Sequence, residues 1–360
     1  MPTVILLLIE AVVGLAYRTK VIKIIDTVDE PANELRVLYS SLKRLHGESF
    51  QAAKLQELRL RIETTGTHAA DQIAAFLRYV ELLNQRRNEY FAMFARPLFW
   101  GVHLSYAVEG WRRRHGGDLE RWLEAVGEVE ALCALAGYSF EHPEDPFPEI
   151  VESGTCLEAE DARHPLLPHA QCIPNSLKLG GDLRLLIVSG SNMSGKSTLL
   201  RTIGTNAVLA QAGGSVRARR FKLSIVDIGA TLRVQDSLQG GTSRFYAEIK
   251  RLHDVMELTK SGEPVLFLFD EILHGTNSHD RAIGAEAVVR GLLERNAIGL
   301  VTTHDLALAR VADVLAPRAA NVHFEDHLEN GRMIFDYQLR PGVVQKSNAL
   351  ELMRAVGLEV

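Results

Sequence analysis

The stretch that decides the fold is Gly190-Ser191-Asn192-Met193-Ser194-Gly195-Lys196-Ser197-Thr198. An apolar run, residues 185–188, precedes it, and Leu199 and Leu200 follow, so the order predicts a buried strand, a glycine-rich turn and a helix. Backbone N–H groups of such a turn wrap a phosphate chain at the N-terminus of the helix. We expect residues 190–198 to bind a nucleotide, with Lys196 reaching its β- and γ-phosphates and the Ser197 hydroxyl ligating Mg²⁺.

A second apolar run, residues 265–269, ends in Asp270-Glu271. An acidic residue at the carboxyl end of a central parallel strand faces the crevice in which ligands bind. Asp270 is therefore expected to support the Mg²⁺ ion, and Glu271 to orient and deprotonate an attacking water, which is typically worth about 10²–10⁴ in rate. Taken alone, the pair would also fit an ordinary strand end. Its place after residues 190–198, which we call the phosphate loop, favours the nucleotide site.

A third strand is predicted at residues 298–303 and ends in His304, which we expect to sense the γ-phosphate. A single histidine at a strand end is usually structural, but its order and spacing here favour the functional interpretation. From Cys156 onward, strands alternate with helices such as residues 280–294, which predicts an α/β fold. The apolar face of that helix is predicted to comprise Ile283, Val288, Val289 and Leu292. Glu329-Asn330-Gly331 is typical of a hairpin turn, and residues 347–356 predict a short helix.

The net charge and the cysteines of the chain bear on its partners and on the compartment in which it functions. The 360 residues carry a formal net charge of −5, so no global field favours nucleic acid, and contact with DNA would need a local basic patch. The three cysteines, Cys133, Cys156 and Cys172, have no metal-ligand spacing. They are typical of reduced thiols in a cytoplasmic protein.

Residues 1–27 form an apolar N-terminal segment, interrupted by Glu10 and followed by Arg18, Lys20 and Lys23. The run is shorter than the ~20 residues that span a bilayer, and it has no signal-peptide cleavage site. Three interpretations stay open: a buried helix, the end of a truncated membrane anchor, and a helix lying in the membrane interface. A cytoplasmic protein with possible membrane association fits all three.

Residues 28–140 have helical periodicity almost throughout. Asp29-Glu30 before Pro31 predicts a helix start. Prolines 143, 146 and 148 predict a stiff, extended linker to the second domain. The apolar stripes of the expected helices are Leu38, Leu42 and Leu45; Leu55, Leu58 and Ile62; Ile73, Phe76, Leu77 and Val80; and Trp122, Val126, Val129, Cys133 and Ala136.

Two basic clusters are candidates for anion binding. Trp111-Arg112-Arg113-Arg114-His115 could bind a phosphate backbone or anionic lipid, or could be the solvated end of a helix. The second cluster, residues 216–222, lies in the C-terminal half, where a plain surface role is the simpler interpretation.

Several motifs together resemble the ATPase domain of the MutS mismatch-repair family. They are the phosphate loop, residues 270–276 and Thr302-Thr303-His304, together with residues 236–245, 163–165, 172–175 and 346–347. The resemblance is dense over residues 155–358 and weaker over 28–150. It implies an α/β P-loop ABC-type ATPase domain at 151–360 with a C-terminal dimerisation helix. An all-α helical domain at 28–150, similar to the family's core and lever region, would precede it.

The resemblance also implies a mechanism. ATP and Mg²⁺ would be the ligands, and the active form would be a homodimer with composite sites, in which Ser243 of one subunit caps the γ-phosphate held by Lys196 of the other. The catalytic set is then Glu271, Lys196, His304 and Ser243. Binding of ATP would close the dimer and hydrolysis would release it, with DNA as the expected partner.

Two residues depart from the family pattern: His274 replaces an arginine in the turn after the acidic pair, and Cys172 replaces an aromatic that stacks on adenine. Phe147-Pro148-Glu149 has the spacing of the family's mismatch-reading motif, but it lies in the proline-rich linker, where we read it as coincidence. We therefore expect no mismatch-reading domain and no nuclease domain in residues 1–360. The alternatives are an ATPase for branched DNA, and a membrane-associated or protein-coupled switch without mismatch recognition.

Overall fold

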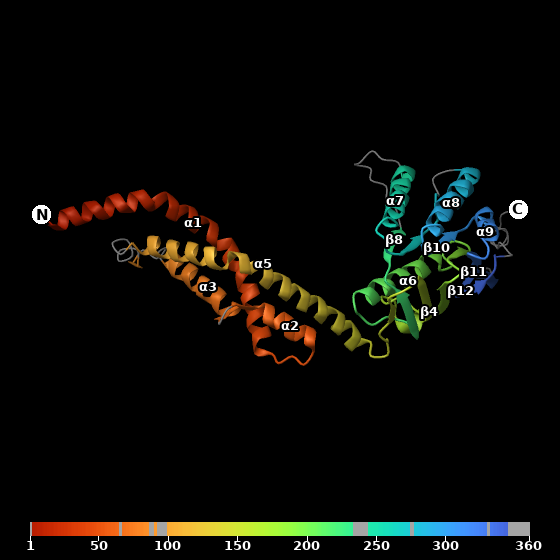
Figure 1. Ribbon diagram of the computed structural model, residues 1–360, viewed down its shortest axis with the longest axis horizontal. Helices are drawn as coiled ribbons and strands as arrows, with labels where there is room; N and C mark the ends of the chain where they lie inside the picture. The colour runs from red at the N-terminus through yellow and green to blue at the C-terminus, as the bar shows by residue number, and fades with distance from the viewer. Residues whose placement is uncertain are drawn as a thin grey trace. The chain divides into compact units, whose positions relative to one another are not determined.

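The computed structural model describes residues 2–64, 67–85, 90–91, 99–232, 244–273, 277–329 and 332–344 (Figure 1). The chain forms two compact units, Met1–Ala134 and Leu135–Val360. The division falls inside a long helix, α5 (Trp100–Glu141), whereas the sequence placed the domain boundary in the proline-rich linker. The last turns of α5 belong to the second unit, in which the Ser139 hydroxyl lies 2.9 Å from the Ser215 hydroxyl. The domain roles predicted for residues 28–150 and 151–360 stay predictions.

The N-terminal unit is mainly helical. It contains α1 (Pro2–Gly47), α2 (Ala53–Arg61), α3 (Ala69–Gln85) and the first part of α5, with a two-stranded hairpin of β1 (Glu63–Thr64) and β2 (Thr67–His68). Its core is built from the helical stripes that the sequence indicates, and the Trp122 side chain is fully buried. Other buried members of this core are Leu38, Leu42, Ile62, Ile73, Phe76, Val80 and Val126.

Two predictions for this unit are wrong. The helix start expected at Pro31 is absent, since α1 runs unbroken from Pro2 to Gly47. An interior proline costs a helix about 3 kcal/mol, but Val28 and Ala32 on either side of it are buried in the core, and this burial offsets the cost. On α5, Cys133 and Ala136 are exposed and do not extend the buried stripe of Trp122.

The apolar N-terminal segment is part of α1. Among the residues that the structure describes, no helix combines the length and the apolar character that crossing a membrane requires.

The described residues of the C-terminal unit form two sheets, which confirms a mixed α/β class. One sheet has the order β12 (Arg332–Pro341), β11 (Ala319–Glu329), β6 (Leu185–Ser189), β10 (Ile298–Thr303), β9 (Val265–Phe269) and β8 (Asp227–Thr231). Its strands are parallel except β12, which pairs antiparallel with β11. The other sheet has the order β3 (Glu149–Val151), β7 (Arg220–Ser224), β4 (Cys156–Ala162) and β5 (Asn175–Gly180).

Helices cover the large sheet. They are α6 (Lys196–Gln211), α7 (Arg244–Leu258), α8 (Ser278–Leu293) and α9 (Leu306–Val314). A short 3₁₀ helix, η1 (His169–Gln171), lies in the connection between β4 and β5 of the other sheet. Strand β6 is buried on both faces: Leu186 and Val188 belong to one apolar core, Leu185 and Ile187 to another. Such continuous apolar strands are typical of parallel sheets between two helical layers. The predicted strands at 185–188, 265–269 and 298–303 are therefore confirmed.

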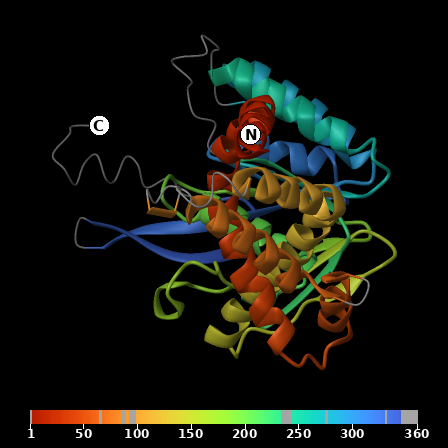
Figure 2. The same cartoon turned by 90° about the vertical axis from the view of Figure 1, so that its left-hand side faces the viewer.

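The remaining sequence predictions for this unit have mixed outcomes. The hairpin is confirmed, since Glu329 pairs with Arg332 and β11 and β12 run side by side (Figure 2); Asn330 and Gly331 lie outside the described residues. Ile283 is 58% exposed on α8, so it does not belong to the buried face. The helix expected at 347–356, with its proposed role in dimerisation, also lies outside the described residues.

Candidate functional site

The loop between β6 and α6 has a backbone that only glycine suits at two positions. Gly190 has φ of +152°, and a Cβ there would lie 2.7 Å from the Ser194 Oγ. Gly195, directly before α6, has φ of +108°. Both angles lie where side chains are disfavoured. Glycines therefore let the loop turn tightly from the buried strand into the helix, as the sequence predicted.

Lys196 begins α6 and folds back over this loop. Its Nζ donates to the Gly190 carbonyl at 2.9 Å and to the Ser191 carbonyl at 2.7 Å. The residue is only 5% exposed. Burial lowers the pKa of the Lys196 ammonium, and the nearby carboxylates of Glu271, Asp270 and Asp326 partly oppose that shift. A buried cation is thus held at the phosphate loop.

Two loop hydroxyls have unmet hydrogen-bonding capacity. Among the described residues, the buried Oγ atoms of Ser191 and Ser194 have no hydrogen-bond partner. Burying a hydroxyl without a partner costs free energy, and a bound phosphate would offer acceptor oxygens next to them. Ser197 is half-buried in the first turn of α6, whereas Asn192 and Thr198 are exposed. The loop therefore fits a nucleotide phosphate chain.

Asp270 and Glu271 follow β9 and are fixed by the neighbouring strand β10. The Thr302 hydroxyl donates to Asp270 Oδ1 at 2.7 Å and accepts from the Glu271 N–H at 2.9 Å. Thr302 is fully buried, and Glu271 has φ of +52°. One threonine thus contacts both acids, and it holds Glu271 in an uncommon backbone conformation. Thr302 belongs to the Thr302-Thr303-His304 motif, but no individual role was predicted for it.

The structure brings together most of the predicted catalytic residues. The Glu271 Oε1 atom lies 4.0 Å from Lys196 Nζ and 3.3 Å from His304 Nδ1. Glu271 is half-buried, and the His304 side chain is 40% exposed. The carboxylate of Glu271 therefore lies between a buried cation and an imidazole. Ser243 and His274, two further residues of the sequence analysis, lie outside the described residues.

The turn after the acidic pair is held by two residues that the sequence analysis missed. The Leu273 N–H donates to the carboxylate of Glu248 on α7, which is buried. The Arg281 Nε on α8 donates to the Leu273 carbonyl at 3.2 Å, and its Nη1 lies 3.7 Å from Asp305 Oδ2. Helices α7 and α8 are thereby connected to the acidic turn. Glu248 and Arg281 belong to no recognisable motif, so only the tertiary fold reveals them.

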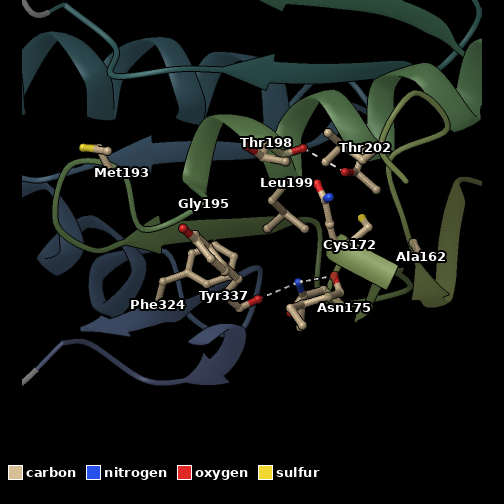
Figure 3. Close-up of a pocket in the computed structure, with 13 residues that line it drawn as sticks. Ala162, Cys172, Asn175, Met193, Gly195, Thr198, Leu199, Thr202, Phe324 and Tyr337 are labelled. Carbon is tan, nitrogen blue, oxygen red and sulfur yellow. Dashed lines mark hydrogen bonds between the residues drawn. The ribbon is translucent and has the colours of Figure 1, made fainter. Parts of the chain in front are cut away.

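A cavity of about 320 Å³ adjoins the phosphate loop (Figure 3). Phe324 of β11 and Tyr337 of β12 contribute aromatic rings, and Cys172 contributes its thiol. The Asn175 side chain fixes β12 at this place, since Nδ2 donates to the Tyr337 carbonyl at 3.0 Å and Oδ1 accepts from the Leu339 N–H at 2.7 Å. Other lining residues are Ala162, Leu167, Gln171, Ile173, Met193, Gly195, Thr198, Leu199 and Thr202.

The cavity contains Cys172, which stands where the MutS family has an aromatic residue. Cys172 is buried, and its sulfur accepts from the His164 N–H at 3.3 Å. Tyr337 is 41% exposed and supplies an aromatic surface from the opposite hairpin. The cavity thus retains an aromatic lining although residue 172 is not aromatic.

The first basic cluster differs from its predicted form. Trp111 is buried, and its Nε1 donates to the Gln72 carbonyl at 2.7 Å, so its ring does not join a surface patch. Arg112 and Arg113 are exposed on α5, and both bond the Glu109 carboxylate. The cluster lies within α5, not at a helix end.

The surface role expected for the second cluster is wrong for Arg217, which is buried and donates to the Pro165 carbonyl at 3.2 Å. The other basic residues of the cluster pair with acids. Arg219 pairs with Glu160 and Asp161, and both Arg220 and Lys222 pair with Glu149. Glu149 thus belongs to a surface ion-pair network, and Phe147 beside it is exposed. These contacts account for Glu149 without a role in reading DNA.

Comparison with known families and proteins gives a consistent result. Residues 186–359 match the family model described as MutS domain V. The match includes the phosphate loop, the acidic pair and His304.

Curated relatives point the same way. The chain is 34% identical over 252 residues to the DNA mismatch repair protein MutS of Thermus aquaticus, an alignment that covers 68% of this chain and 29% of the relative. It is 31% identical over 255 residues to the DNA mismatch repair protein MutS 2 of Halobacterium salinarum, covering 69% and 29% of the two chains. For MutS of Thermus thermophilus the identity is 32% over 248 residues, again with 29% of the relative covered. The aligned part of this chain therefore spans less than a third of these relatives.

Proposed function

We propose, since this chain is a MutS-related protein, that its C-terminal unit binds and hydrolyses ATP. The observation that carries the proposal is the position of Lys196, whose buried ammonium lies on the phosphate loop and 4.0 Å from the carboxylate of Glu271. Cation, acid and loop glycines together have the composition of a phosphoryl-transfer site.

The nucleotide would extend from the cavity to the loop. Its base would enter the cavity beside Tyr337 and Phe324, and its phosphates would meet the loop N–H groups, the hydroxyls of Ser191 and Ser194, and Lys196. The Ser197 hydroxyl and the Asp270 carboxylate are the residues that would hold Mg²⁺, which neutralises phosphate charge when bound. The two unpartnered hydroxyls and the oxygen character of both Mg²⁺ donors support this fit.

Glu271 is the group that we assign to the hydrolytic water. Its carboxylate would accept the proton of that water, while Thr302 holds its backbone and His304 contacts its Oε1 atom. The Asp270 carboxylate accepts from the Thr302 hydroxyl and is available to the metal. His304 is a positioning residue for Glu271 and a candidate sensor of the γ-phosphate. In this proposal, each polar contact that Thr302 and His304 make with the two acids has a function.

The proposed assembly is a homodimer driven by ATP. Ser243 of one subunit would complete the site formed around Lys196 of the other, so binding of ATP would close the dimer and hydrolysis would open it. The resemblance to MutS proteins supports this step. DNA is the proposed partner, because the relatives are DNA mismatch repair proteins by name, and recognition of mismatches is not part of the proposal.

The test is the ATPase rate of the full chain with homoduplex, mismatched and branched DNA, each at two salt concentrations. We expect stimulation that weakens as salt rises, because contacts to phosphates release counterions. The DNA structure that stimulates most would identify the substrate. A rate that is measurable but equal with every DNA would refute the DNA part and favour a protein- or membrane-coupled switch. No hydrolysis under any condition would contradict the ATPase assignment.

A further inference from the structure

The N-terminal unit contains a cluster of metal-ligand side chains that the ATP site does not use. His46 lies in the last turn of α1, Glu63 in β1 and His68 in β2. One ligand atom of each residue lies within 4.8 Å of those of the other two. The spacing of the three residues in the sequence matches no standard metal-binding motif, so only the fold reveals that they lie together.

The hairpin geometry explains why Glu63 and His68 meet. They are direct partners across the β1–β2 ladder. Side chains of directly opposed residues in an antiparallel pair extend from the same face of the ladder, with their Cβ atoms about 5 Å apart. The end of α1 supplies the third side chain, since the His46 and His68 ring centroids are 3.6 Å apart. Three ligand groups from three elements, α1, β1 and β2, therefore converge.

Two further observations indicate a missing partner at this place. Within the described residues, the buried Nδ1 atom of His68 has no hydrogen-bond partner. A small cavity of about 10 Å³ lies among the same side chains and is lined by His46, Glu63 and His68 together with apolar neighbours. A space of that size accommodates roughly one water-sized species. The Arg59 Nε lies 4.0 Å from the Glu63 carboxylate, which is an ion-pair distance but too long for a hydrogen bond.

We propose that His46, Glu63 and His68 bind a divalent transition metal, with zinc as the best fit. Two imidazole nitrogens and one carboxylate oxygen form a common zinc ligand set, which leaves the fourth tetrahedral position for water. Ligand atoms about 2.1 Å from a tetrahedral zinc are about 3.4 Å apart. The present ligand atoms lie within 4.8 Å of one another, so rotation of the side chains must close the separation by at most about 1.4 Å. The negative end of the α1 dipole favours a cation beside His46. The metal would connect the β1–β2 hairpin to the end of α1.

The first experiment measures zinc binding to the full chain. The protein is stripped with a chelator and dialysed, and Zn²⁺ is then titrated by calorimetry, with bound metal counted by mass spectrometry. We expect one zinc per chain and a higher melting temperature after loading. The variants His46→Gln, Glu63→Gln and His68→Gln should each weaken binding at least tenfold, since even changes outside the ligand shell cost about 10–100-fold.

Matched controls distinguish this site from adventitious binding. His103→Gln and Glu48→Gln change exposed residues of the same unit that lie outside the cluster, and both should bind zinc like the unaltered chain. Failure of the stripped chain to bind zinc, or equal binding by all six proteins, would overturn the proposal.

A second measurement needs no variant and covers the case in which a substitution prevents folding. X-ray absorption at the zinc edge of the loaded, unaltered chain should show imidazole ligands at about 2.0–2.1 Å. A sulfur shell at about 2.3 Å would place the metal on cysteine and contradict the assignment.

Discussion

Glu271 is the residue on which the proposed chemistry depends most. Its carboxylate lies between Lys196 and His304, and its backbone N–H is bonded by Thr302. Glu271→Gln should keep ATP binding but lower the hydrolysis rate by about 10²–10⁴, because an amide cannot accept the proton of water. Single-turnover hydrolysis alongside equilibrium ATP binding measures both. Glu263→Gln, at an exposed position, is the control; hydrolysis by Glu271→Gln at the unaltered rate would remove Glu271 from its role.

Thr302 is expected to act through the two acids. Thr302→Val keeps the shape of the side chain but removes the partner of Asp270 Oδ1 and of the Glu271 N–H. Leaving these partly buried groups without partners should cost about 1–3 kcal/mol, which urea unfolding would detect. The catalytic rate should fall more than ATP affinity, since Thr302 does not line the cavity. Unchanged stability and rate together would show that the hydroxyl holds neither acid.

Asp336 provides a test of pH dependence at the residue scale. Its hydrogen bond from Arg340 holds the pKa of the Asp336 carboxyl below its usual 3.8. Because the pKa is lowered on folding, the pair stabilises the protein at any pH above 3.8 and loses that contribution as the pH falls through the lower, folded value. Asp336→Asn should therefore cost about 0.5 kcal/mol at pH 7, and the difference should shrink only below pH 3.8. Urea unfolding at several pH values measures it; a difference that disappears already at pH 6 would contradict the assignment.

At the scale of elements, the phosphate loop depends on backbone conformations that only glycine adopts easily. Gly195→Ala should cost about 1–3 kcal/mol and also weaken ATP binding, since the new Cβ would lie 3.2 Å from the Tyr337 ring. Gly213→Ala is the matched control, because Gly213 also has positive φ, at +84°, but has no atom within 4 Å of the added Cβ. Both variants should lose stability, and only Gly195→Ala should lose affinity in a nucleotide titration. Equal ATP affinities of the two variants would contradict the proposal that the nucleotide binds at this loop.

Some elements follow directly from local sequence and others do not. The strands β6, β9 and β10 are buried on both faces and were predicted, because their hydrophobic runs are unambiguous. The passage of α1 through Pro31 was not predictable, since packing of Val28 and Ala32 outweighs a strong local signal. The acids, Lys196 and His304 were likewise found from motifs. Glu248, Arg281 and the His46 cluster were missed because distant elements bring their partners to them.

At the scale of the whole molecule, the chain combines a mainly helical unit with a mixed α/β unit. Family resemblance concentrates in the second, where residues 186–359 match MutS domain V. The exposed arginines at 112 and 113 share one acid, Glu109, which reduces the local positive charge that DNA would meet. Replacing Arg112 to Arg114 with glutamine should therefore reduce salt-dependent retention on duplex DNA only partly. Complete loss of retention would show that this cluster is the main DNA contact.

The most direct test of the central claim is equilibrium binding of ATP with Mg²⁺ to the full chain and to Lys196→Ala. Lys196 contributes the buried cation of the phosphate loop, so its removal should abolish measurable binding while the circular dichroism spectrum stays unchanged. Lys178→Ala, at an exposed position of the same unit, should bind ATP like the unaltered chain. Undiminished ATP binding by a folded Lys196→Ala variant would contradict the assignment of this loop as the ATP site.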